Sequence, residues 1–352
     1  MKTTNYRRKE RKNSTINALN DAQKLIFAPL TFQAISALLE LKILESINDS
    51  PQTVNEIIGR LHLNEYIVRT LLDVAEVTGI VEKDSNNKFK PTKTGECFLY
   101  DDMTKVNFNF IKNCCYLGAN ELTQSFLQEK PMGLKRFYKD SDTIYPELPN
   151  FSEEFKKGWY EFDNYYSDNC FDIIYEIISE KNPDKIYDIG GNTGKFEQVC
   201  LKNNPNIDIT MLDLKENINT VKEILTGVSF YPIDILDEKL DMPEFSGAIL
   251  MSQFLDCFSK KQIKSILTRI KAASKKDTYV YILEPFTDNQ VFDGAKLALT
   301  HTSLYFTCMA NGYSKMYTMP EMIEMVEDSG LKLNKAYQNI GAFDYTLLEC
   351  KI

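Results

Sequence analysis

The chain has 352 residues, of which 43% are hydrophobic and 26% charged, and its net charge at neutral pH is −9. This composition is that of a globular protein with room for about two domains, and it excludes disordered, collagen-like and fibrous classes. The negative charge disfavours nucleic acids and anionic membranes as partners. The eight cysteines are scattered, and with only two histidines we expect no metal site.

Residues 1–19 are predicted to be a disordered basic tail, because no apolar core of the signal-peptide type follows the charges. The longest uncharged apolar stretch, 26–39, is shorter than the roughly 20 residues that a membrane span needs. We interpret it as a buried helix. Since the cysteines also suggest reduced thiols, we expect a cytoplasmic protein with no membrane partner.

Residues 20–100 show a rhythm of three helices followed by a hairpin. Thr53 and Glu56 form a predicted capping box, Asn64 caps the next helix, and 80–91 reads as a two-stranded wing. The pattern is typical of a winged helix. The helix over 64–78 carries more acidic than basic residues, which disfavours DNA binding and favours a dimerisation role.

Residues 101–180 are predicted to be a mainly helical linker that also covers the substrate. The stretch is rich in aromatic residues, with Trp159, Tyr160 and Phe162 close together. Such a cluster fits a hydrophobic core and equally fits a pocket for a flat ligand.

Residues 181–352 alternate strands with helices, which predicts an α/β fold with a doubly wound parallel sheet. The expected strands are 185–189, 208–214, 228–233, 247–252 and 278–283, and the expected helices are 195–202, 217–225, 260–273 and 320–329. The segments 331–337 and 345–351 are predicted to form a final antiparallel pair.

The strongest motif is DIGGNTGK at 188–195, where the first strand turns into the first helix. Glycines permit a tight turn, and the helix N-terminus offers free N–H groups to a polar ligand. The spacing does not fit a phosphate-binding P-loop, because Gly190 and Gly194 enclose three residues and Phe196 follows Lys195. It fits the short GxGxG form, with Asn192 in the middle position, which suits S-adenosylmethionine (SAM) rather than a dinucleotide.

Two carboxylates at later strand ends support a nucleoside site. Asp213 ends the second strand about twenty residues after the glycines, where a carboxylate accepts hydrogen bonds from ribose hydroxyls. Asp234 ends the third strand and is placed to accept from the adenine amino group.

With these motifs the chain resembles the SAM-dependent small-molecule O-methyltransferases of the caffeate, hydroxyindole and hydroxyneurosporene type, from about residue 20 to residue 352. The glycine loop is similar to the family's DVGGGTG, MLDL at 211–214 to its FDLP, IDIL at 233–236 to its GDMF, and FKKGW at 155–159 to its FNxxM. The resemblance implies a Rossmann-like class I methyltransferase domain at 181–352 and a winged-helix domain that forms an intertwined homodimer. It also implies SAM as cofactor, S-adenosylhomocysteine (SAH) as product, a small-molecule acceptor and no metal.

The resemblance also assigns residues. Those implied to bind the cofactor are Asp188, Gly190, Gly191, Asn192, Gly194, Asp213, Leu214, Asp234, Ile235 and Ser252, the last standing where a lysine is usual. Those implied to line the acceptor site are Phe155, Trp159, Phe162, His301, Phe306, Asn311 and Met316.

The catalytic region departs from the family. LDCFS at 255–259 stands where the family has LHDWS, so Asp256 replaces the general-base histidine. Glu284 matches a glutamate that orients that histidine, and Met316 replaces a second one.

An ordinary aspartate, with a pKa of about 3.9, is a poor base for a phenol of pKa about 10. Burial beside Glu284 would raise the proton affinity of Asp256, or the acceptor arrives already ionised and is only oriented. His301 is a rival base. In the alternative structural interpretations, Asp256 caps the helix that starts near Ser259, and Glu284 is a solvated strand end.

The sequence therefore predicts a SAM-dependent O-methyltransferase that acts on a hydroxyl of an aromatic or polyene-like molecule, with Asp256 and Glu284 as the catalytic pair. Two alternatives stay open. One is a SAM-binding relative that catalyses another reaction, and the other is a winged-helix regulator that senses SAM.

Overall fold

The structure, a computed structural model, describes residues 15–352, which divide into one unit that ends at Lys105 and a second unit of Val106–Ile352. Residues 1–14 of the predicted tail lie outside the described residues. Residues 15–19 are helical, so the prediction of a tail up to residue 19 is wrong for that part. The boundary near 105 lies close to the predicted one near 100, whereas the predicted linker belongs largely to the second unit.

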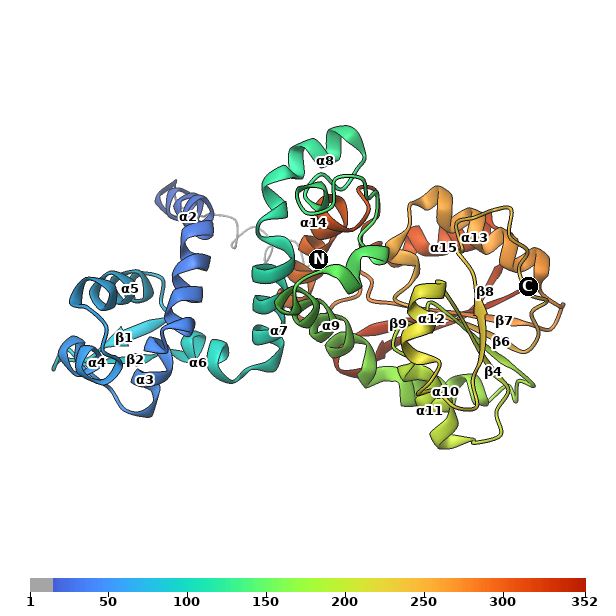
Figure 1. Ribbon diagram of the computed structural model, residues 1–352, viewed down its shortest axis with the longest axis horizontal. Helices are drawn as coiled ribbons and strands as arrows, with labels where there is room; N and C mark the ends of the chain where they lie inside the picture. Colours follow the sequence, from blue (N-terminus) through green and yellow to red (C-terminus); the bar gives the residue numbers. More distant parts are fainter. Residues whose placement is uncertain (1–14) are drawn as a thin grey trace, which may run out of the picture. The chain divides into compact units, whose positions relative to one another are not determined.

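The first unit is mainly helical with a small antiparallel hairpin (Figure 1). Its elements are α2 (Thr15–Glu40), α3 (Ile43–Asp49), α4 (Val54–Leu61), α5 (Glu65–Val77), β1 (Val81–Lys83), β2 (Phe89–Pro91) and α6 (Lys93–Tyr100). The predicted caps are confirmed: Thr53 and Glu56 form a capping box on α4, and Asn64 accepts from the Ile67 N–H at 3.0 Å on α5. The helices and wing therefore follow the order expected from the sequence.

Helix α2 differs from its prediction. It is 26 residues long, and its most apolar 18-residue window has a mean hydropathy of 1.3, so by length and composition alone it could cross a membrane. Among residues 15–352 it is the one helix that meets these criteria, which are weak evidence when taken by themselves. Only 17% of that window is buried. The expectation of a buried helix at 26–39 is wrong for Ile26 and Leu30, which are exposed, and right for Ile35 and Leu38, which are buried. The exposed apolar side chains of α2 thus lie in its first part, up to Leu30.

The second unit contains a seven-stranded sheet in the order β5-β4-β3-β6-β7-β9-β8. Its strands are β3 (Ile186–Ile189), β4 (Ile209–Asp213), β5 (Ser229–Pro232), β6 (Ala248–Ser252), β7 (Tyr279–Glu284), β8 (Lys332–Ile340) and β9 (Tyr345–Lys351). The first five are parallel to one another, and β9 pairs antiparallel with β7 and β8. This is the predicted Rossmann-like sheet with its terminal antiparallel pair.

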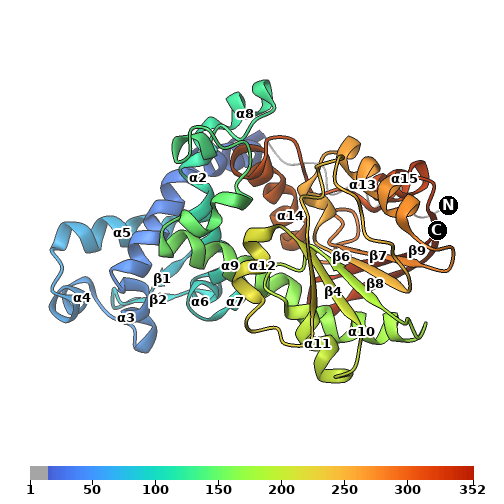
Figure 2. The same cartoon turned by 45° about the vertical axis from the view of Figure 1, so that its right-hand side comes forward.

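Alternate side chains of the strands pack into two cores on opposite faces of the sheet. On one face, Ile249 and Met251 of β6 pack with α13 (Lys260–Ala273) and α15 (Met319–Asp328). On the other face, Ala248 and Leu250 pack with α10 (Phe171–Ser179) and α11 (Lys195–Asn203). Figure 2 shows these helix pairs on either side of the sheet. Burial on both faces explains the nearly continuous apolar runs of the parallel strands.

A third core covers the carboxyl ends of the strands and joins segments that lie far apart in the sequence. Its helices include α9 (Glu153–Ser167) and α14 (Asp293–Tyr305), with α14 continuing as a π-helical turn at η7 (Phe306–Ala310). The remaining elements of this unit are α7 (Asp102–Phe110), which begins in the first unit, η1 (Ile111–Cys115), η2 (Gly118–Glu121), α8 (Leu122–Gln128), η3 (Leu134–Arg136), η4 (Tyr145–Asn150), η5 (Asp168–Cys170), α12 (Lys215–Val221), η6 (Leu255–Cys257) and η8 (Gly341–Phe343).

Candidate active site

A cavity of about 340 Å3 lies at the carboxyl ends of the parallel strands, within the second unit. Its floor is formed by the segments that follow β3, β4, β5 and β6, and its cover by α9, α14 and η7. In the sheet, β4 lies on one side of β3 and β6 on the other, so the strand order reverses direction at β3 and the cavity lies at this switch point. This is where open α/β sheets bind ligands.

The glycine loop 188–195 forms one wall of this cavity. Gly190 has a φ of +83° and Gly194 a φ of +73°, and Asn192 also adopts a left-handed conformation with φ +46°. A Cβ atom at Gly191 would approach Glu197 Oε1 to 2.7 Å, so any larger residue would require the neighbouring side chains to shift. The backbone of the loop is therefore exposed to the cavity.

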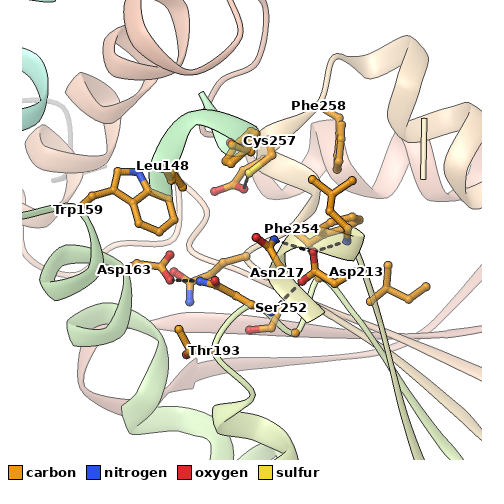
Figure 3. A pocket seen from close by; sticks show the side chains of 18 of the residues that line it. Leu148, Trp159, Asp163, Thr193, Asp213, Asn217, Ser252, Phe254, Cys257 and Phe258 are labelled. Atoms are coloured by element: carbon orange, nitrogen blue, oxygen red, sulfur yellow. Dashed lines mark hydrogen bonds between the residues drawn. The ribbon is translucent and has the colours of Figure 1, made fainter. Parts of the chain in front are cut away.

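Asp213, at the end of β4, ties the next strand to this loop. Its Oδ2 accepts a hydrogen bond from the Asn192 N–H at 2.9 Å, and its Oδ1 accepts from the Leu214 N–H and from Asn217 Nδ2, both at 2.7 Å. The residue is 9% exposed, and burial raises the pKa of its carboxyl group against the lowering effect of these donors. Figure 3 shows Asp213 and Asn217 joined by one of these bonds.

The next strands place further polar groups at the rim. Asp234, after β5, is exposed and uses Oδ1 to accept from the Leu236 N–H at 2.9 Å. The Ser252 hydroxyl at the end of β6 and the Gln253 Nε2 beside it are buried in the wall and have no hydrogen-bond partner within residues 15–352. A buried polar group without a partner is costly, so these atoms are suited to a polar ligand.

Asp256 lies in η6, between β6 and α13, where it lines the cavity and is 5% exposed. Burial raises the pKa of its carboxyl group to about 7, and the nearby carboxylate of Asp163 acts in the same direction. The Cys257 thiol donates to Asp256 Oδ1 at 3.5 Å. Asp256 therefore changes protonation near neutral pH.

Glu284, at the end of β7, lies behind Asp256 and outside the cavity lining. Its Oε1 accepts from the backbone N–H of Leu255 at 2.9 Å and of Asp256 at 3.4 Å. Burial raises the pKa of Glu284 well above its usual range, and the Asp256 charge adds to this. Glu284 thus fixes the backbone that carries Asp256, and the interpretation of Glu284 as a solvated strand end is wrong because the residue is 2% exposed.

The helix-cap interpretation of Asp256 is also wrong. Helix α13 is capped by Ser259, whose hydroxyl accepts from the Gln262 N–H while the Gln262 side chain accepts from the Ser259 N–H in return. The Asp256 carboxyl group is therefore not needed to begin the helix.

The cover of the cavity is aromatic. Trp159 of α9 donates from Nε1 to the Tyr305 hydroxyl at 2.8 Å, and Phe162 stacks on Phe110 with ring centroids 3.9 Å apart. Tyr145 also lines this wall, with its hydroxyl group buried beside Cys257. Figure 3 shows Trp159 on the same side of the cavity as Leu148 and Cys257. A flat ring would find apolar contact on several sides here.

The structure brings most of the predicted site residues to one cavity. Those that line it are Asp188, Gly190, Gly191, Asn192, Asp213, Leu214, Asp234, Ile235, Ser252, Asp256, Trp159, Phe162, Phe306, Asn311 and Met316. Gly194 does not line it and instead stands at the start of α11.

Two of the residues expected at the acceptor site are placed elsewhere. His301 is exposed on α14, where its Nδ1 contacts the Leu297 carbonyl oxygen at 2.8 Å, so its prediction as a pocket residue and rival base is wrong. Phe155 is packed in the core, stacked on Phe151 at 3.8 Å, because it points away from the cavity face of α9. Asn311 lines the cavity, but its side chain is engaged with Cys257 O at 2.7 Å and with Ser314.

The fold adds polar groups to the site that were not predicted from the sequence. Asp163 comes from α9, Asn217 from α12 and Gln253 from the end of β6. Asp163 follows Trp159 by four residues, a spacing that places both on one helix face. That spacing was a usable signal.

A family model described as an O-methyltransferase domain matches residues 147–331, more than half of the chain. The chain belongs to the O-methyltransferase domain family. A second model, described as a Dimerisation2-like domain, matches residues 20–89 in the first unit. As a member of this family, the protein is a SAM-dependent methyltransferase of the small-molecule type.

Individual relatives are distant. The chain is 20% identical over 285 residues to O-methyltransferase 7 of Dictyostelium discoideum, which covers 79% of this chain and 80% of that protein. Among solved structures, the mitomycin 7-O-methyltransferase MmcR has a TM-score of 0.71 at 17% identity, covering 95% of this chain and 97% of that one. Human N-acetylserotonin methyltransferase in complex with SAM has a TM-score of 0.63 at 14% identity, covering 96% and 98%. At these identities the structural likeness shows the fold.

The cavity fits the SAM cofactor of O-methyltransferases. Asp213 and Asp234 stand at successive strand tips as acceptors, and the Ser252 hydroxyl and Gln253 amide offer buried polar groups with unused capacity. Within residues 15–352, no group of three or more His, Cys, Asp or Glu side chains is arranged to hold a metal ion.

Proposed function

We propose that this enzyme transfers the methyl group of SAM to a hydroxyl group of an aromatic or polyene-like small molecule, with Asp256 as general base and Glu284 as its positioning residue. The observation that carries this is the Asp256 carboxyl group, which is buried in the cavity wall and has a pKa raised to about 7. A base of that strength is ionised for much of the time at neutral pH.

The chain's own residues would hold SAM along the floor of the cavity. Asp213 would accept from the ribose hydroxyls and Asp234 from the adenine amino group, while the glycine loop would pass beneath the methionine part. When bound, SAM supplies a sulfonium-activated methyl group. The protein's task is to hold the acceptor oxygen in line with that methyl and to remove its proton.

Asp256 would accept the hydroxyl proton as the oxygen attacks. Glu284 contributes through the backbone N–H bonds that hold η6 in place, and not by contact with the acceptor. An acidic acceptor that binds already ionised would need less help from Asp256, and orientation alone would then supply most of the rate enhancement.

The aromatic cover supports a ring-containing acceptor. Trp159, Tyr305 and Phe306 face the cavity together with the stacked pair of Phe110 and Phe162. The names of two relatives specify mitomycin and N-acetylserotonin as the molecules that those proteins methylate, which supports a small-molecule acceptor here.

We also infer a homodimer formed through the domain at 20–89. The exposed apolar side chains of α2 fit a partner subunit, with Ile26 64% and Leu30 67% exposed. Such a partner, rather than a lipid bilayer, would cover the helix in a cytoplasmic enzyme.

The test is incubation with SAM labelled on its methyl group and a panel of phenols and polyene alcohols, followed by detection of the label in the acceptor. Calorimetric titration with SAH is run in parallel. Transfer to a hydroxyl supports the proposal. Tight SAH binding without transfer to any acceptor would favour the second candidate, a SAM-binding relative that catalyses another reaction. The observation that favours this candidate is the replacement of the family's histidine by Asp256.

A further inference from the structure

Asp163 is a buried carboxylate on the covering helix that contacts the glycine loop. Its Oδ2 accepts a hydrogen bond from Asn192 Nδ2 at 2.8 Å, and it lines the cavity. Figure 3 shows the Asp163 side chain directed into the cavity, with a dashed line marking this bond. Asn192 is held from the other side, because its backbone N–H donates to Asp213. A chain of polar contacts therefore runs from α9 through the loop to the end of β4.

The strand order indicates which part of the cofactor lies near Asp163. Asp234 follows β5 and Asp213 ends β4, so the adenosyl group would lie over these two strands. The glycine loop follows β3, the next strand in the sheet. The methionine part, which carries the ammonium group, would extend over this loop toward Asn192 and Asp163.

Burial disfavours the ionised form of Asp163. Burial raises the pKa of its carboxyl group to about 6, and the charge of Asp168 adds to this against the lowering effect of Asn192. The one cationic side chain in the cavity lining, as far as residues 15–352 show, is Lys195, which lies 3.9 Å from Asp168. A ligand ammonium would offset the cost of a buried carboxylate.

We propose that Asp163 binds the ammonium group of SAM and thereby fastens α9, the helix that carries Trp159, onto the cofactor. The inference rests on the proposed SAM site and adds a residue from the cover to it. Because Trp159 and Asp163 are one helical turn apart, binding of the cofactor at Asp163 would also fix the indole that faces the acceptor.

The experiment compares two ligands that differ in the group at issue. SAH carries the ammonium, whereas 5′-methylthioadenosine keeps adenine, ribose and sulfur but lacks the whole amino-acid part. Both are titrated by calorimetry into the native enzyme, the Asp163→Asn variant and a control variant, Glu154→Gln. Glu154 is an exposed carboxylate on the same helix and does not line the cavity.

Asp163→Asn keeps an oxygen that can accept from Asn192 but removes the charge. We expect it to weaken SAH binding about 10- to 100-fold, the effect of losing a charge-assisted hydrogen bond, and to leave methylthioadenosine binding unchanged. Glu154→Gln should bind both ligands as the native enzyme does.

Three results would overturn the proposal: unchanged SAH binding by Asp163→Asn, equal weakening of both ligands, which indicates a structural role, or weakening of SAH binding by the control variant too. Binding of methylthioadenosine also shows that the variant is folded, and Asp163→Ser serves as a second variant if Asp163→Asn is not. If the native enzyme binds neither ligand, the proposed function fails and not this assignment alone.

Discussion

Burial decides the chemistry available to Asp256. In water an aspartate is too weak a base for a phenol, whereas in the cavity wall the pKa of Asp256 is raised to about 7 by burial. The substitution of the family's histidine by a carboxyl group is therefore compatible with proton removal near neutral pH. Burial thus gives the Asp256 carboxylate a basicity that an aspartate in water does not have.

This gives a pH prediction. Turnover should rise with pH through about 7 as Asp256 becomes a carboxylate, and Asp256→Asn should lower the rate about 10²- to 10⁴-fold and remove the inflection. SAH affinity, measured by calorimetry, should stay unchanged. Asp241→Asn, an exposed carboxyl outside the cavity, is the control. An unaltered pH–rate profile in Asp256→Asn would mean that the acceptor arrives ionised.

Asp213 has both a ligand role and a structural role. Asp213→Ala should weaken SAH binding by roughly 2 to 4 kcal/mol, because the ribose acceptor is lost and the Asn192 N–H, Leu214 N–H and Asn217 amide lose theirs. Asp213→Asn keeps one acceptor oxygen, so its SAH affinity should lie between those of the native enzyme and of Asp213→Ala. Calorimetry measures both, and native affinity in the alanine variant would move the nucleoside site elsewhere.

Some site residues can be predicted from the sequence and others cannot, and the difference has a physical reason. Asp213 and Asp234 follow strands, and strand ends can be predicted from runs of apolar residues. The residues of the cover are harder, because which face of α9 looks into the cavity depends on tertiary packing. Phe155 and Trp159 are both aromatic and close in sequence, yet one is core and the other lines the cavity.

At the scale of elements, the junction of β3 and α11 contains a second buried acid pair. Glu197 of α11 packs under Gly191 beside Asp188, and the two buried carboxyl groups interact with each other. Burial raises the pKa of Asp188 to about 7 and that of Glu197 well above its usual range. The folded state therefore holds protons that the unfolded chain releases near pH 4.

Because the folded-state pKa values of Asp188 and Glu197 are raised, the stability that this pair contributes is fully present below about pH 4 and is lost as the pH rises through about 7. The Glu197→Gln variant has no ionisable group at this position. Its free energy of unfolding should therefore decline less with pH and exceed that of the native enzyme by roughly 1 to 3 kcal/mol at pH 8. Urea unfolding at pH 5 and pH 8 measures it. An identical decline in native enzyme and variant would contradict the pairing.

The bounds of elements were predictable where caps mark them. The helix at 260–273 and the strand at 345–351 agree with α13 and β9, the helix being marked by the capping box of Ser259 and Gln262. The helix predicted at 217–225 is observed earlier, as α12 at Lys215–Val221. No side-chain cap marks its start, and Asn217 turns to Asp213 instead.

At the scale of the whole molecule, α2 exposes a row of apolar side chains. Leu19, Ile26 and Leu30 recur at helical spacing and are 59%, 64% and 67% exposed. The sequence predicts a buried helix over 26–39, and the structure buries Ile35 and Leu38 of that stretch but leaves Ile26 and Leu30 exposed. A single chain's sequence pattern does not distinguish burial in its own core from burial against a second copy.

If a second copy covers α2, charges on this face should dissociate the dimer. Ile26→Glu with Leu30→Glu should convert the enzyme to a monomer in sedimentation equilibrium, because two buried charges without partners are unfavourable. Lys24→Glu, whose position is on the opposite side of the same helix and whose side chain is 78% exposed, should stay dimeric. A native enzyme that sediments as a monomer would refute the homodimer.

Trp159 is the chain's single tryptophan, and it lies in the cavity cover with its indole bonded to Tyr305. Its fluorescence can be excited selectively over that of the tyrosines, so the emission comes from one known place. A ligand that enters beneath the cover would alter the surroundings of this indole and shift or quench its light. The enzyme thus carries a built-in optical reporter with which unlabelled acceptors can be screened before any product is known.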